Sequence, residues 1–289
     1  MMKRLFLVLL LVTGISISLT ASGDSILLVS SKWSITNIAP GIVHKQIHFS
    51  NGELFSSNQF INIIEVNPSA GRTVEIIPSP VLIETSKLAA QHEAIAAING
   101  SFFKFNYEHN TVDYNSVDYI RKGGQNLAPN TYERNRRAMH QRGALAVHNN
   151  KFYILKADQL KEWERFILAD EVITTGPVLR VAGNDEALEN SSFYTTRHPR
   201  TAMAKREEGT IIFFTVDGRA KESAGMSLRE LQSTLRWLGA SDIINLDGGG
   251  STTMFVTGIG SNGIVNHPTD NRTFDNLGER KVANIVIIK

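Results

Sequence analysis

The residues best suited to chemistry lie in one stretch, N-L-D-G-G-G-S-T-T-M at residues 245–254. The apolar run Ile243 to Leu246 predicts a short buried strand that ends at Asp247. Consecutive glycines cost backbone entropy unless the chain needs positive φ angles or close approach of a ligand to the backbone. The glycines and the hydroxyl residues behind them are Gly248, Gly249, Gly250, Ser251 and Thr252. A carboxylate, bare N–H groups and hydroxyls together predict a site for a polar, anionic or sugar-like ligand.

Two well-known phosphate and calcium loops are excluded for this stretch. It lacks the G-K-[ST] ending of a Walker A loop, so no lysine would reach a nucleotide phosphate. It also lacks the alternating Asp/Asn run, closed by Glu, of an EF-hand. A tight connection between strands, with Asp247 as a turn residue, remains the simpler alternative.

Other strand-like runs also end in a polar residue followed by glycine. Asn99 and Gly100 follow the apolar run 94–98, and Asp217 precedes a glycine and Arg219 after the run 210–216. Further along, the sequence R-H-P-R-T-A places Arg200 at the entry to a strand, and arginine recognises phosphate and carboxylate groups in a bidentate way. Because several strands end in this pattern, we expect their tips to converge on one pocket.

The elements that must position these residues are predicted as follows. Ser227 and Glu230 form a capping box for a helix whose leucines share one face and which stops at Gly239. Residues 61–66 and 73–77 flank a Pro/Gly turn and predict a hairpin, and residues 143–154 predict a second hairpin at Asn149-Asn150. We expect a terminal strand over residues 280–288. Residues 104–142 lack sustained periodicity and predict a functional loop, a lid or an insertion.

Composition indicates an exported globular protein. The 289 residues begin with a basic segment containing Lys3 and Arg4, an apolar segment Leu5 to Val12, and small residues up to Gly23. This pattern predicts a signal peptide over residues 1–23 and one large domain over residues 24–289. Removing the signal peptide brings the formal charge from +2 to 0, which argues against a polyanion binder, including nucleic acid. The chain has no cysteine, which fits a bacterial periplasmic or secreted protein and excludes cysteine nucleophiles.

The whole set of motifs resembles the phosphodiester glycosidase family over residues 60–289. It carries N-G-S-F-F from Asn99, R-H-P-R-T-A, V-D-G-R, the glycine-rich stretch and Arg280, in that order. One departure is Ser101, which stands where the family usually has a second glycine. The resemblance implies an α+β fold with mixed β-sheets and packed helices. It also implies hydrolysis of a glycan or sugar-1-phosphodiester at the anomeric C–O bond.

Roles for individual residues follow from this resemblance. Glycosidases usually pair two carboxylates, so Asp217 and Asp247 are the candidate catalytic pair. Arg200 and Arg219 are the candidate phosphate clamp, with Arg280 as a third cation. The remaining candidate substrate-binding residues are Asn99, Gly100, Phe102, Gly248, Gly249, Gly250, Ser251 and Thr252.

Several alternatives stay open from the sequence. Asp217, Arg219 and Arg200 could form a buried ionic network without chemistry, and Phe102 could be a core residue. No cofactor is expected, although carboxylates and carbonyls would suit Ca²⁺ or Mg²⁺. The competing functions are a phosphodiesterase that cleaves the P–O bond, and a non-catalytic protein of glycan binding or exopolysaccharide assembly.

Overall fold

The computed structural model describes residues 23–104, 114–130, 138–157 and 160–289. The predicted signal peptide therefore falls almost entirely outside the described residues. The described chain is built mainly from three β-sheets, with four α-helices and short 3₁₀ turns at their edges. Among the described helices, none has the length and apolar character needed to cross a membrane.

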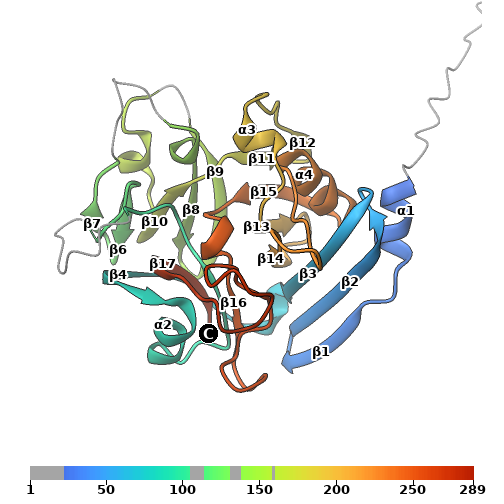
Figure 1. Cartoon of the computed structure of the whole chain (residues 1–289). Helices are drawn as coiled ribbons and strands as arrows, with labels where there is room; N and C mark the ends of the chain where they lie inside the picture. Colours follow the sequence, from blue (N-terminus) through green and yellow to red (C-terminus); the bar gives the residue numbers. More distant parts are fainter. Residues whose placement is uncertain (1–22, 105–113, 131–137, 158–159) are drawn as a thin grey trace, which may run out of the picture.

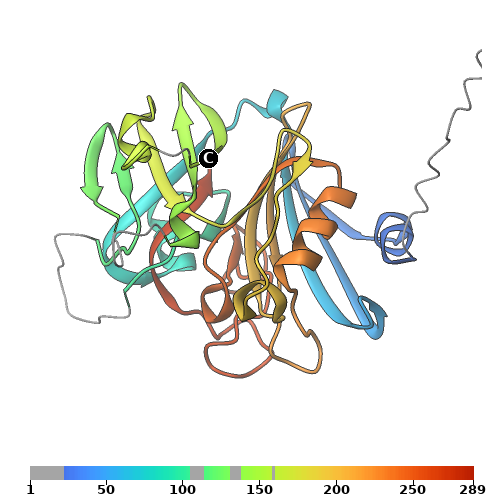
Figure 2. The same cartoon turned by 90° about the horizontal axis from the view of Figure 1, so that it is seen from above.

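The largest sheet has eight strands. In spatial order they are β1 (Ser34–Ala39), β2 (Ile42–Leu54), β3 (Ser57–Val66), β14 (Ile211–Val216), β13 (Arg200–Arg206), β15 (Ala240–Asn245), β11 (Val178–Val181) and β12 (Asn184–Asp185). Three helices pack against this sheet: α1 (Gly23–Ser30), α3 (Ser192–Thr195) and α4 (Leu228–Trp237). Figure 2 shows α4 lying along one of its faces.

Two smaller sheets lie on the other side of the molecule (Figure 1). One is β7 (Gln125–Ala128), β6 (Ile120–Lys122), β10 (Glu171–Thr175), β8 (Gly143–His148) and β9 (Lys151–Lys156). The other is β16 (Met254–Val256), β5 (Ala96–Asn99), β17 (Lys281–Ile288) and β4 (Val74–Glu84). Helix α2 (Thr85–Gln91) packs on this four-stranded sheet. The 3₁₀ turns are η1 (Pro68–Ala70), η2 (Met139–Gln141), η3 (Trp163–Phe166) and η4 (Gly249–Ser251).

The central strands of the eight-stranded sheet are buried on both faces. Met203 and Ile244 point into a core shared with the two smaller sheets, whereas Ala204 and Ile243 point into a core shared with α1 and α4. Strands covered on both faces read as continuous apolar runs, which is the pattern of residues 211–216. The layering is therefore two small sheets, one large sheet and then helices.

The register of this sheet brings distant motifs to one edge. β13 is antiparallel to both β14 and β15, with Arg200 opposite Val216 and Ala202 opposite Asn245. The start of β13 therefore lies beside the ends of β14 and β15, where Asp217 and Asp247 follow.

The sequence predictions are confirmed for several elements, wrong for one hairpin and met in part for the fold class. The β8–β9 hairpin turns at Asn149-Asn150, and β17 is the expected terminal strand. The expected hairpin over residues 61–77 is wrong, because β3 pairs in the eight-stranded sheet and β4 pairs with β17 in another. The expected α+β class is met in part: helices pack on β-sheets, but strand outweighs helix, and every pair between the described strands is antiparallel.

The capping box of α4 is confirmed and can be tested. The Ser227 hydroxyl accepts from the Glu230 N–H at 3.2 Å, and the Ser227 N–H donates to the Glu230 carboxylate at 2.8 Å. Ser227→Ala is expected to lower the free energy of unfolding by about 1 kcal/mol, measured by chemical denaturation. Ser233→Ala, on the same helix and with no cap to lose, is the control and should change stability by less than about 0.5 kcal/mol. Equal losses in the two variants would contradict the capping role.

Candidate active site

The glycine turn after β15 is packed against two guanidinium groups. A Cβ placed on Gly249, whose φ is +63°, would lie 3.0 Å from Nη2 of Arg219. A Cβ placed on Gly250 would lie 2.4 Å from Nη2 of Arg280. Only glycine lets both guanidinium groups lie directly on the backbone of the turn. The third glycine, Gly248, lies where a Cβ would be 2.7 Å from the Pro199 carbonyl oxygen.

Asp247 stands at the start of this turn. Its carboxylate accepts from the Gly248 N–H at 2.9 Å, and the residue is partly exposed. Burial raises the pKa of the Asp247 carboxyl to about 6, although the Ser251 hydroxyl, the Gly248 N–H and the positive charges of Arg280 and His140 act in the opposite direction. This carboxylate is thus held in its ionised form near neutral pH by groups that converge on it.

Asn99 fixes the backbone of the glycine turn through hydrogen bonds. Its amide nitrogen donates to the Asp247 carbonyl oxygen at 2.7 Å, and its amide oxygen accepts from the Thr201 hydroxyl at 2.7 Å and the Thr253 N–H at 3.1 Å. Asn99 is fully buried, so these three bonds link β5, β13 and the turn. The next residue, Gly100, accepts from the Asp247 N–H at 3.1 Å and donates to the Asn284 carbonyl at 3.0 Å.

Arg200 lies beside the turn, but its guanidinium is directed into the protein. Its Nε donates to the Met226 carbonyl at 2.9 Å, and its Nη2 donates to the Phe193 and Thr196 carbonyls at 2.9 and 3.0 Å. The side chain is 2% exposed, and burial together with the charge of Arg219 lowers its pKa to about 10. Arg200 therefore ties loops together, and Arg219 and Arg280 are the guanidinium groups on the turn.

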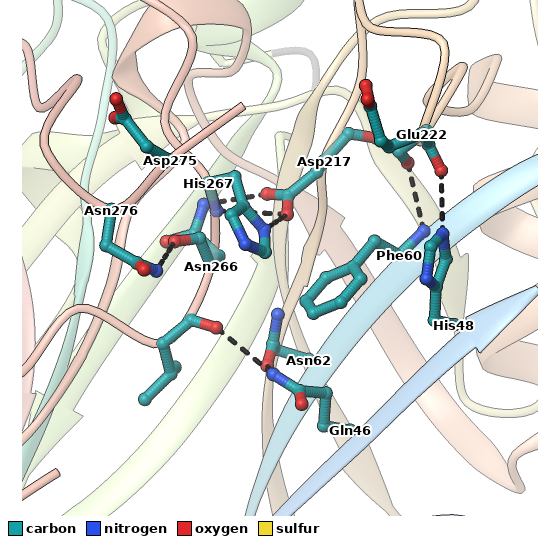
Figure 3. A network of polar contacts seen from close by, with 12 residues as sticks. Gln46, His48, Phe60, Asn62, Asp217, Glu222, Asn266, His267, Asp275 and Asn276 are labelled. Atoms are coloured by element: carbon teal, nitrogen blue, oxygen red, sulfur yellow. Dashed lines mark hydrogen bonds and ion pairs between the residues drawn. The ribbon is translucent and has the colours of Figure 1, made fainter. Parts of the chain in front are cut away.

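Asp217 is fully buried, and its carboxylate is saturated with donors (Figure 3). It accepts from the Asn266 amide at 2.9 Å, from the His267 N–H at 3.0 Å, and from His267 Nδ1 at 2.8 Å. The ring of His267 stacks on Phe274 at 3.9 Å between centroids. Asn266 also donates to the Thr252 carbonyl at 3.0 Å, which ties Asp217 to the far end of the glycine turn.

One pair of residues at this site was not predicted from the sequence. His140 in η2 is joined through Nδ1 to the buried Asp118 carboxylate at 2.6 Å, and its ring lies 5.0 Å from that of Phe102. Both residues belong to the stretch 104–142, where the sequence predicted a functional loop. No period or motif marked them, because the two partners are brought together only by the fold.

The predicted site residues thus divide into two groups. Asp247, the glycine turn, Ser251, Arg219 and Arg280 converge, with Asp247 partly exposed and Arg219 exposed. Asn99, Gly100, Arg200, Asp217 and Thr252 surround the turn as buried or backbone-bonded supports. Phe102 is partly exposed beside His140. Among the residues that the structure describes, no cluster of three or more His, Asp or Glu side chains is arranged to hold a metal ion.

This geometry agrees with a comparison of the chain with known families. The model of the phosphodiester glycosidase family matches residues 92–289. The chain belongs to the phosphodiester glycosidase family. The match includes all of the residues that converge at the glycine turn.

Two curated relatives match shorter stretches. N-acetylglucosamine-1-phosphodiester alpha-N-acetylglucosaminidase of Mus musculus is 34% identical over 109 residues, which cover 36% of this chain and 20% of the mouse protein. An uncharacterised SPbeta prophage-derived protein of Bacillus subtilis (strain 168) is 39% identical over 62 residues, or 22% of this chain and 10% of that protein. The chain thus matches a fifth or less of the length of these relatives.

This phosphodiester glycosidase shares its fold with several solved structures. The catalytic domain of the zebrafish N-acetylglucosamine-1-phosphodiester alpha-N-acetylglucosaminidase, auto-inhibited by its pro-peptide, superposes with a TM-score of 0.63 and 18% identity, covering 89% of this chain and 87% of that one. A hypothetical protein from Synechocystis gives a TM-score of 0.59 and 17% identity, covering 90% and 64%.

The glycine turn gives the first test of this site. Gly250→Ala would push aside the ends of two flexible side chains, Arg280 and Asp270, without meeting backbone, so the protein should still fold. Displacing one cation from the turn is expected to raise the concentration of a phosphate-containing ligand needed for half-saturation about tenfold, measured by calorimetry. Arg280→Gln should give a similar loss. Unchanged affinity in both variants would contradict a role for the turn in anion binding.

A second test concerns Arg200. Lysine cannot reach three separate carbonyl groups at once, so Arg200→Lys is expected to lower the free energy of unfolding by about 2–4 kcal/mol in denaturant titrations. Arg229→Lys is the matched control, because Arg229 is exposed and also donates to backbone carbonyls, those of Leu188 and Glu189. Its effect should stay below about 0.5 kcal/mol. A normally stable Arg200→Lys protein would show that the buried contacts are dispensable.

Proposed function

We propose that this phosphodiester glycosidase hydrolyses a sugar-1-phosphodiester at the bond between the anomeric carbon and the phosphate oxygen. The products are a free sugar and a phosphomonoester. The observation that carries the proposal is the convergence of Arg219, Arg280 and the partly exposed Asp247 carboxylate on one glycine turn.

The charges at the turn suit such a substrate. A phosphodiester carries one negative charge, and the leaving phosphomonoester carries more, so the two guanidinium groups would stabilise charge that grows in the transition state. The anomeric carbon becomes positive as its bond to oxygen breaks, and an ionised Asp247 beside it would stabilise that charge or form a covalent bond to the carbon. Asp247 and the two arginines thus supply opposite charges for the two halves of the breaking bond.

The surrounding residues would shape the pocket. Phe102, which is partly exposed beside His140, is our candidate for contact with the sugar. Asn99, Gly100, Arg200 and Asp217 hold the turn in place. The name of the mouse relative, N-acetylglucosamine-1-phosphodiester alpha-N-acetylglucosaminidase, supports N-acetylglucosamine as the first sugar to test.

We also propose that residues 24–289 act as one exported domain. A single apolar core joins residues from all three sheets, which supports one folding unit. The basic and apolar residues before Gly23 support cleavage of a signal peptide. Mass spectrometry of the protein recovered from a bacterial expression host should find an N-terminus near Asp24.

The bond that breaks can be identified with isotope-labelled water. An N-acetylglucosamine-1-phosphoalkyl diester is incubated with the protein in water enriched in heavy oxygen. Cleavage at the anomeric carbon places the heavy oxygen in the sugar, whereas a phosphodiesterase that cleaves the P–O bond would place it in the phosphate. Label in the phosphate would overturn the proposal in favour of that alternative. Binding without turnover of this diester would favour a glycan-binding protein.

Asp247→Asn separates activity from stability. The variant should lose at least about a thousandfold in kcat, because the charge opposite the anomeric carbon is gone. Since the folded-state pKa of Asp247 is raised from 3.8 to about 6, ionisation opposes folding, and this cost is complete above about pH 6 and disappears towards pH 4. The variant should therefore have a higher melting temperature than the wild type at about pH 7.5, with the difference shrinking at about pH 4. A difference in melting temperature that stays constant between about pH 4 and pH 7.5 would show that the pKa of Asp247 is not raised in the folded protein.

A further inference from the structure

A histidine–aspartate pair adjoins the proposed reaction centre, on a different part of the chain. The Asp118 carboxylate is fully buried and holds His140 Nδ1 at 2.6 Å, while the His140 side chain is 21% exposed. Its Nε2 has no hydrogen-bond partner among the described residues, so one ring nitrogen is anchored and the other is available. This arrangement fixes the orientation and the tautomer of an imidazole that exchanges protons with a substrate.

The fold places His140 next to Asp247. The Cα of His140 lies 3.7 Å from the position of a Cβ on Gly176, and the Gly176 carbonyl accepts from the Asn245 amide at 3.0 Å. Asn245 ends β15, two residues before Asp247. On its other side, His140 lies beside Phe102, three residues after the Asn99 that holds the Asp247 carbonyl.

Electrostatic effects agree with this placement. The charge of His140 lowers the pKa of Asp247, and the charge of Asp247 raises the pKa of Asp118. Burial raises the pKa of Asp118 to about 7, with the His140 hydrogen bond acting against it. Among the described residues, Arg280 and His140 act electrostatically on Asp247, and His140 and Asp247 act on Asp118.

The proposed reaction needs a general base but does not need a general acid. The departing phosphomonoester is stable as an anion, so its oxygen requires no proton, but the attacking water must lose one. Asp217, which the sequence paired with Asp247, has no exposed surface, and its oxygens are already bonded by Asn266 and His267. The second catalytic group must therefore come from elsewhere at the site.

We propose that His140 is the general base of the reaction and that Asp118 is its positioning residue. This inference rests on the proposed function. Nε2 of His140 takes a proton from water as the water oxygen bonds to the anomeric carbon. The bond from that carbon to the phosphate oxygen, or to Asp247 if a covalent intermediate has formed, breaks with its electron pair moving to the oxygen. His140, now a cation stabilised by Asp118, returns the proton to solvent.

Variants of the pair test this assignment. With the phosphoalkyl diester as substrate, His140→Gln should lower kcat by about 10²- to 10⁴-fold with little change in KM. Asp118→Asn should lower kcat by at least about tenfold and change the pH dependence of kcat. His148→Gln is the matched control, because His148 also pairs with an aspartate, Asp170, but on an exposed surface, and its kcat should equal that of the wild type.

Azide distinguishes a base from a merely structural residue. Azide attacks carbon without losing a proton, so with His140→Ala it should restore release of the phosphomonoester and yield a glycosyl azide. It should not restore Asp247→Asn to the same extent. For variants that fail to fold, nitrogen NMR of the wild-type His140 ring is the second measurement, and it should show the neutral tautomer with its proton on Nδ1 and none on Nε2.

The outcomes distinguish a failure of the role of His140 from a failure of the proposed function. An inactive wild-type protein would overturn the proposed function, and this inference with it. An active wild type whose His140→Gln variant keeps full kcat, or whose His140→Ala variant is not rescued by azide, would overturn only the role of His140. A neutral ring with its proton on Nε2 instead of Nδ1 would also contradict it.

Discussion

The site depends on a close approach between backbone and guanidinium groups that any side chain on the turn would prevent. Arg219 and Arg280 lie where the Cβ atoms of Gly249 and Gly250 would otherwise stand. This arrangement brings two guanidinium groups onto the turn that follows Asp247. The consecutive glycines therefore let Arg219 and Arg280, the latter ion-paired with Asp270, lie directly on a turn that begins with a carboxylate.

The rest of the fold keeps that turn rigid. The antiparallel register of β13 with β14 and β15 brings three motifs to one edge, and buried polar residues then fix their positions. Asn99, Arg200 and Asp217 have almost no exposed surface, and each donates to or accepts from several partners. Buried polar groups with complete hydrogen bonding specify one geometry, because any displaced arrangement leaves some of them unpaired. Asp247 is the exception, since its raised pKa records a stability cost at the point where chemistry is proposed.

The sequence predicted what local chemistry determines. The capping box of α4, the Asn149-Asn150 turn and the glycine turn all depend on residues a few positions apart. The sequence predictions failed where strand pairing or side-chain contacts join residues that are far apart in the chain. The alternating pattern of residues 61–77 does not show which sheet each strand joins. The sequence also cannot distinguish an arginine that faces solvent at a strand end from one that, like Arg200, donates to buried backbone carbonyls. The Asp118–His140 pair lacked any periodic signal and became visible only in three dimensions.

The central claim is that the glycine turn binds the phosphate while Asp247 faces the anomeric carbon. A crystal structure of the protein soaked with a sugar-1-phosphodiester, in the Asp247→Asn variant to prevent turnover, tests this most directly. The account predicts phosphate oxygens within hydrogen-bond distance of Arg219 and Arg280, and the anomeric carbon next to residue 247. A diester bound elsewhere, or bound with its phosphate away from both arginines, would contradict it.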